Sequence, residues 1–129
     1  MSTRRTESAS RYEAEFGFCR GLRRGDQFWI AGTAPIGADG TNVGVGDPAA
    51  QARRCLEIIS EAVDALGAAL SDVTRTRMFL TRIDDWSTIG GVHGEFFGAN
   101  PPVSTMVQIA ALIDPEWLVE IEAEGTIDD

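Results

Sequence analysis

The segment from Asn100 to Glu124 constrains the fold most, because two stretches in it alternate residue types with a period of two. In the first stretch, one face carries Val103, Thr105, Val107 and Ile109, and the other carries Ser104, Met106 and Gln108. In the second, three apolar residues alternate with three carboxylates: Val119, Ile121 and Ala123 with Glu120, Glu122 and Glu124. This pattern is typical of half-buried β-strands. We expect these two strands to form one wall of any site.

Two helices are predicted upstream of these strands. Asp47-Pro48 indicates the start of the first helix, because aspartate caps helices well and proline fits the first turn. Its apolar stripe has helical spacing: Ala52, Cys55, Ile58, Ile59, Ala62, Val63 and Leu66. Gly67 is the expected left-handed cap. The second helix follows Asp84-Asp85 and shares one face among Ile89, Val92, His93, Phe96 and Phe97.

Three more strands complete the predicted order. They cover Phe16 to Leu22, Gln27 to Gly32, and Asp72 to Thr81, with a hairpin turn at 23–26. Residues 1–15 are expected to be a loosely ordered start. The whole chain, 1–129, is predicted to be one α+β domain with two helices on one face of a mixed sheet. The other face would need cover, which favours assembly with further subunits.

Composition narrows the classes of partner. The formal net charge of −9 argues against a nucleic-acid partner, which would favour a basic surface. No stretch predicts a membrane span or a secretory signal, so a cytoplasmic location is expected. Cys19 and Cys55 form no CxxC pair, and one histidine is too few for the usual zinc spacings. We therefore expect reduced thiols and no metal.

The chain resembles the Rid family, also called the YjgF/YER057c/UK114 family and once labelled L-PSP endoribonucleases. The resemblance runs from Gly17 to Glu124 and is specific through the order and spacing of seven elements. These are Gly25-Asp26 to Gly32 with Pro35, Gln51, Leu66-Gly67 with Leu70-Ser71-Asp72-Val73, Phe79-Leu80-Thr81, Glu95-Phe96-Phe97, Pro102 through Leu112, and Val119-Glu120-Ile121-Glu122-Ala123.

The resemblance implies a chorismate-mutase-like α+β fold and a homotrimer with a small-molecule cleft between each pair of subunits. The best-known members hydrolyse reactive enamines and imines to 2-keto acids and ammonia, without a metal or an organic cofactor. It also implies that Glu120 is the acid/base group and that the backbone at Gly32 lines the cleft.

Three positions depart from the family pattern. The family's carboxylate-binding arginine is replaced by Ser104, its tyrosine by Phe18 and its helical asparagine by Gly90. Met106, beside Ser104, is expected to add an apolar wall. A guanidinium holds a carboxylate by two charge-assisted hydrogen bonds, and one serine hydroxyl cannot replace them. These departures predict weak 2-iminoacid deaminase activity.

Two functions therefore stay open. The first is a deaminase-like hydrolase of an imine, enamine or related reactive metabolite, with Glu120 at its centre. The alternative is a non-catalytic binding module for a small metabolite on the same scaffold. A cation from Arg20, Arg77 or Arg82 could replace the missing arginine in either case. His93 shares its helical face with apolar residues, so we expect it to be packed and hydrogen-bonded rather than catalytic.

Overall fold

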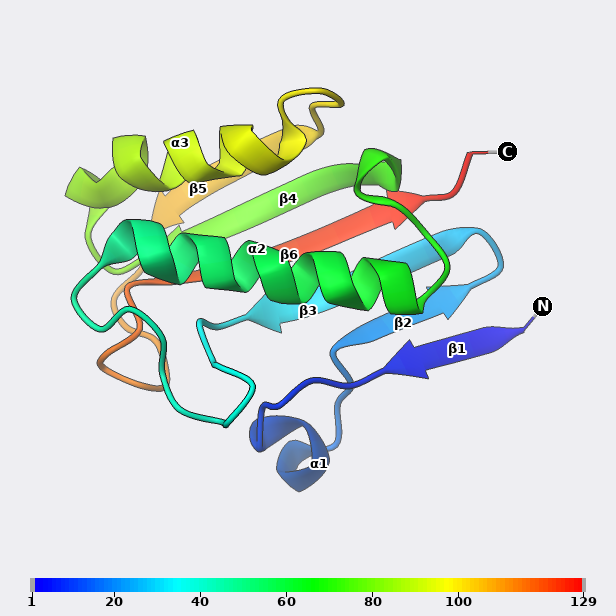
Figure 1. Cartoon of the computed structure of the whole chain (residues 1–129), viewed down its shortest axis with the longest axis horizontal. Coiled ribbons are helices and arrows are strands. Elements are labelled where there is room, and N and C mark those ends of the chain that lie inside the picture. Colours follow the sequence, from blue (N-terminus) through cyan, green and yellow to red (C-terminus); the bar gives the residue numbers. More distant parts are fainter. Residues whose placement is uncertain (1, 129) are drawn as a thin grey trace.

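The computed structural model describes residues 2–128 as one mixed sheet with two helices across one face (Figure 1). The strands are β1 (Thr3–Thr6), β2 (Gly21–Arg24), β3 (Gln27–Thr33), β4 (Val73–Leu80), β5 (Val103–Gln108) and β6 (Val119–Thr126). The helices are α1 (Tyr12–Phe16), α2 (Pro48–Ala65) and α3 (Trp86–Phe97), with 3-10 turns η1 (Leu70–Asp72) and η2 (Ile83–Asp85). The predicted α+β class is confirmed. Met1 and Asp129 of the predicted domain lie outside the described residues.

The strand order across the sheet is β1-β2-β3-β6-β4-β5. Neighbouring strands run antiparallel except β4 and β5, which are parallel. The α3 helix makes the crossover between β4 and β5, as a parallel pair requires. The C-terminal strand β6 therefore lies in the middle of the sheet, and β5 forms one edge of it.

The long helix α2 begins and ends as the sequence predicts. The Asp47 carboxylate accepts a hydrogen bond from the Ala50 N–H at 3.1 Å, and Pro48 is the first helical residue. Gly67, just past the helix, has a φ of 78°, in the left-handed region that favours glycine. The apolar stripe of α2 packs against the sheet and belongs to the main buried core, together with residues of β3, β4, β6 and α3.

The N-terminal segment is more ordered than the sequence predicts. In place of a loose start over 1–15 and a strand from Phe16, it forms β1, paired with β2, and then the helix α1. Gly17 ends α1 with a φ of 76°. The prediction missed α1 because five residues are too short to show helical periodicity. What holds α1 in place is the buried carboxylate of Glu13, described below.

The two strands expected to form one wall of the site are not neighbours, because β4 lies between β5 and β6. Val119, Ile121 and Ala123 of β6 are buried under the helices, as predicted. Because side chains alternate along a strand, the Glu120 side chain projects from the opposite face of the sheet. Ser104 pairs in register with Thr76 of β4, whose side chain is fully buried on the helix side. The side chains of Ser104 and Glu120 in one chain therefore project from opposite faces of the sheet.

The sheet face away from the helices is open in the single chain. Val103 and Val107, which the sequence assigns to the apolar face of a half-buried strand, are 62% and 41% exposed. The carboxylates of β6 find partners on this face, since Arg77 Nη1 donates to Glu122 at 3.0 Å and to Glu124 at 3.2 Å. An open face that combines valines with paired charges is suited to contact with another subunit.

Candidate functional site

A cavity of about 530 Å³ lies where β3 ends, bounded by the N-terminal segment, α1 and α2. Its apolar walls include Phe16, Phe18, Ile36 and Trp117. The sequence-predicted residues Gly32 and Glu120 also line it. Three of the six predicted site residues, Phe18, Gly32 and Glu120, are therefore brought together within one chain.

Glu120 provides the carboxylate of this cavity. Burial raises the pKa of Glu120, and the nearby Arg20 guanidinium offsets part of that rise. Within residues 2–128 no group donates a hydrogen bond to the Glu120 carboxylate. A half-buried carboxyl with free oxygen atoms and a raised pKa is suited to accepting and giving a proton.

Gly32 makes room for this carboxylate. A β-carbon at position 32 would overlap Oε1 of Glu120, so no other residue fits without moving the carboxyl group. The φ of Gly32 is not in the left-handed region, so the requirement is one of space rather than of backbone conformation. The backbone at Gly32 therefore lies directly against the Glu120 carboxyl group.

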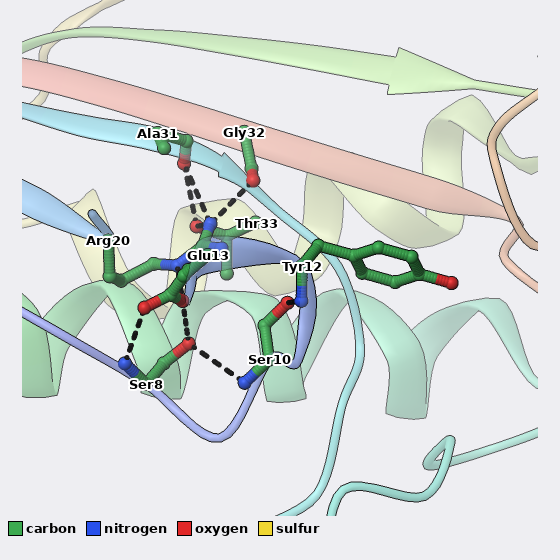
Figure 2. Close-up of polar contacts among 8 residues, drawn as sticks. All are labelled: Ser8, Ser10, Tyr12, Glu13, Arg20, Ala31, Gly32 and Thr33. Carbon is green, nitrogen blue, oxygen red and sulfur yellow. Dashed lines mark hydrogen bonds and ion pairs between the residues drawn. The ribbon is translucent and has the colours of Figure 1, made fainter. Parts of the chain in front are cut away.

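Arg20 is buried beside the cavity in a network shown in Figure 2. Its Nε donates to Glu13 Oε2 at 3.0 Å, and Nη1 donates to Thr33 Oγ1 at 3.1 Å and to the Gly32 carbonyl. The Ser8 N–H and hydroxyl donate to the same Glu13 carboxylate. The guanidinium therefore joins α1 to the end of β3, and its charge is already paired inside the chain.

The other candidate cations are also engaged. Arg77 pairs with the carboxylates of β6 on the open sheet face, and Arg82 Nη2 pairs with Asp85 at 3.0 Å beside α3. Arg54, on the cavity wall, donates through Nε to the Ile36 carbonyl at 2.9 Å. Each of these arginines has a partner within the chain, which makes it a poor replacement for the arginine that Ser104 replaces.

The remaining three predicted site residues form a second group on the helix side of the sheet. A β-carbon at Gly90 would lie 3.8 Å from Cε of Met106. Ser104 Oγ lies 2.8 Å from Thr76 Oγ1, which in turn lies 2.8 Å from His93 Nε2. The predicted hydrogen-bonded role of His93 is confirmed. Within one chain, Gly90, Ser104 and Met106 are not brought to the Glu120 cavity.

Sequence reasoning missed the residues that hold this site in place. Glu13 and Ser8 belong to a segment read as loose, and no pattern marks a single glutamate as the partner of an arginine seven residues later. Thr76 occupies an apolar-facing position of β4, which is the one signal that could have indicated a buried hydroxyl with a role.

The described residues contain neither a metal-binding cluster nor a membrane-spanning helix. No group of three histidine, cysteine, aspartate or glutamate side chains within residues 2–128 is arranged to hold a metal ion. No helix in the described part of the chain is both long and apolar enough to cross a membrane.

The fold and the cavity define a small α+β protein with a carboxylate over a glycine at the end of a central strand. Comparison with known proteins identifies the family. The family model described as Endoribonuclease L-PSP matches residues 8–127. The protein SCO2049 of Streptomyces coelicolor is 34% identical over 124 residues, covering 96% of this chain and 92% of that protein.

Solved structures of similar proteins support the same family. Rv2704 of Mycobacterium tuberculosis, described as a member of the YjgF/YER057c/UK114 family, is 40% identical with a TM-score of 0.88 over 98% of this chain and 100% of that one. E. coli TdcF with bound serine is 26% identical, with a TM-score of 0.82 over 96% and 94% of the two chains. The chain belongs to the Endoribonuclease L-PSP family, the YjgF/YER057c/UK114 or Rid family, which confirms the resemblance seen in the sequence.

Proposed function

We propose that the protein hydrolyses a small imine, enamine or related reactive metabolite in a cleft between subunits of a homotrimer, with Glu120 as the acid/base. The single observation that carries the proposal is the Glu120 carboxyl, which lies over Gly32 in a cavity with apolar walls and has no hydrogen-bond donor among residues 2–128. Its raised pKa suits a group that must both take and give a proton.

Assembly supplies the second half of the proposed cleft. Ser104 and Met106 lie on an edge strand, and the open sheet face carries exposed valines. A neighbouring subunit packed on this face could set its β5 edge against the Glu120 cavity. The Rid resemblance supports this arrangement, in which one subunit provides Phe18, Gly32 and Glu120, and its neighbour provides Gly90, Ser104 and Met106.

The proposed ligand is small and carries little negative charge. Arg20 and Arg54, the arginines that line the cavity, are engaged by Glu13, by backbone carbonyls and by Glu57. Without a free cation, a carboxylate would enter the Glu120 cavity against a like charge. The bound serine in the TdcF structure supports a ligand of small size for this fold. The net charge of −9 favours such a ligand over RNA.

The test is a comparison of three forms in a ketoacid assay with 2-iminopropionate, generated in the cuvette by an amino-acid oxidase. The wild type should act weakly. Ser104→Arg should act about a hundredfold faster, because a bidentate contact is worth roughly 3 kcal/mol. Adding Glu120→Gln to Ser104→Arg should return the rate to the uncatalysed background.

The same assay can reject the proposal. A Ser104→Arg rate that Glu120→Gln leaves unchanged would remove Glu120 from the chemistry. If neither the wild type nor Ser104→Arg exceeds the background, the non-catalytic binding module becomes the better account. The paired arginines favour that alternative, because they leave no group to hold an anionic substrate during reaction.

A further inference from the structure

The side chains of Ser104, Thr76 and His93 form a continuous hydrogen-bonded chain from the edge of the sheet to α3. Ser104 is exposed, Thr76 is fully buried, and His93 is half-buried. Thr76 Oγ1 lies 2.8 Å from Ser104 Oγ and 2.8 Å from His93 Nε2. The Glu120 chemistry proposed above uses neither of these two contacts.

The direction of this chain is set by the histidine. A hydroxyl carries one proton, so Thr76 donates to one of its two partners and accepts from the other. Burial lowers the pKa of His93, which favours the neutral ring at neutral pH. In the neutral tautomer that carries its proton on Nδ1, Nε2 accepts from Thr76, and the hydrogen bond that otherwise runs from Thr76 to Ser104 reverses, so that Ser104 donates to Thr76. The Ser104 proton thus has a path to a base.

We propose that Ser104 is a nucleophilic hydroxyl that takes an acyl group from a small activated ester, with its proton relayed through Thr76 to His93. This inference does not rest on the proposed imine chemistry, because all three residues belong to one chain and lie on the sheet face opposite Glu120. The site is built from a side chain that replaces the arginine of the family pattern.

One backbone donor lies beside the proposed nucleophile. The Ile109 N–H donates to the Leu80 carbonyl at 2.8 Å, and in a parallel ladder alternate residues bond the same neighbour. Ser104 and Met106 belong to the other set, so their N–H groups point to the open edge of β5. The Ser104 N–H adjoins the proposed nucleophile, and a donor of this kind stabilises the negative oxygen of a tetrahedral intermediate.

With p-nitrophenyl acetate as the ester, the proposed acyl transfer proceeds as follows. Ser104 Oγ bonds to the carbonyl carbon while its proton passes to Thr76 Oγ1 and the Thr76 proton passes to His93 Nε2. The carbonyl re-forms as the bond to the phenolate oxygen breaks. p-Nitrophenolate leaves as an anion, His93 releases its proton to water, and Ser104 remains as an acetyl ester.

The experiment treats the full chain with p-nitrophenyl acetate and locates the acetyl group by peptide mass mapping. All eleven basic residues are arginine, so no lysine competes, and Cys19 and the amino terminus are told apart by their peptides. We expect acetyl-Ser104 in the wild type. Thr76→Val should slow its formation about a hundredfold, the usual contribution of a general base. Thr76→Ser, which keeps the hydroxyl, should retain the reaction.

Two further variants keep the test decisive. His93→Gln can still hydrogen-bond Thr76 but is no base, so it should lose the reaction even if Thr76→Val fails to fold. Ser87→Ala, at an exposed serine of α3, should acetylate Ser104 at the wild-type rate. Acetylation of Ser104 that persists unchanged in His93→Gln, or wild-type labelling confined to Cys19 and the amino terminus, would overturn the proposal.

Discussion

At the scale of single residues, the site depends on one carboxyl group that is held in a half-buried position. The pKa of Glu120 is raised mainly by burial. The neutral form of this carboxyl is therefore more favoured in the folded state than in the unfolded chain. Its stabilising contribution is therefore present at low pH and is lost as pH rises through the folded pKa.

The first prediction follows from this sign. Glu120→Gln should unfold at a higher temperature than the wild type at pH 7, because burial disfavours the ionised form of the carboxyl and glutamine has no ionised form. The difference should disappear at pH values below the ordinary glutamate pKa, where both side chains are neutral. Thermal unfolding followed across that pH range measures it. A wild type that is the more stable form at pH 7 would mean that Glu120 is held by a favourable partner.

The second prediction concerns Gly32. Gly32→Ala places a methyl group where Glu120 Oε1 now lies, so the carboxyl must move. Overpacking of this kind costs about 1–3 kcal/mol. Denaturant unfolding should show that loss, and the Gly32→Ala, Glu120→Ala double variant should recover most of it because the opposing carboxyl is gone. Equal losses in the single and double variants would place the strain elsewhere.

At the scale of elements, the N-terminal segment is fixed to the sheet by a buried ion pair. Arg20 on the approach to β2 joins Glu13 of α1 to the carbonyl and hydroxyl groups at the end of β3 (Figure 2). Both side chains are about 95% buried, so each requires the other. This pair sets the position of Phe18, whose ring centroid lies 5.7 Å from Arg20 Cζ.

The third prediction is a double-mutant cycle on this pair. Glu13→Leu should destabilise the protein by about 3–5 kcal/mol, because it leaves the Arg20 charge buried without a partner. Glu13→Leu combined with Arg20→Met should be markedly more stable than Glu13→Leu alone. Unfolding by urea gives the free energies. An additive cycle would show that Glu13 and Arg20 stabilise the fold independently.

How much the sequence predicts differs by element. Asp47-Pro48, Gly67 and the stripe of α2 each carry a local signal, so this helix is predicted nearly to the residue. The alternation of β5 is also correct, yet its buried side is not, because periodicity cannot tell which face the helices cover. The pairing of Arg20 with Glu13 is a tertiary contact between two common residues, and no local pattern records it.

The Glu120 site was predicted only in part for the same reason. The family pattern names Phe18, Gly32 and Glu120, and all three line one cavity in the structure, while their role in binding stays a prediction. The chain of Ser104, Thr76 and His93 could not be predicted, because it joins two strands and a helix through contacts across 28 and 17 residues. Residues so far apart meet only through the strand order.

At the scale of the whole molecule, the open sheet face is the feature that a single chain leaves incomplete. The helices α2 and α3 cover one face (Figure 1). The other face exposes Trp29, Val103 and Val107 beside paired charges. We propose that two further copies cover it. Light scattering at micromolar concentration should give three times the chain mass, and Val107→Glu should lower that mass while leaving the circular dichroism of the fold intact. A wild type of monomer mass would remove the proposed cleft.

The proposed cleft is tested most directly by a crystal structure of the assembled protein. The account predicts that Ser104 and Met106 of one subunit face Glu120 and Gly32 of its neighbour across a space that fits one small ligand. An assembly in which Glu120 opens to bulk water, away from the β5 edge of every neighbouring subunit, would contradict it.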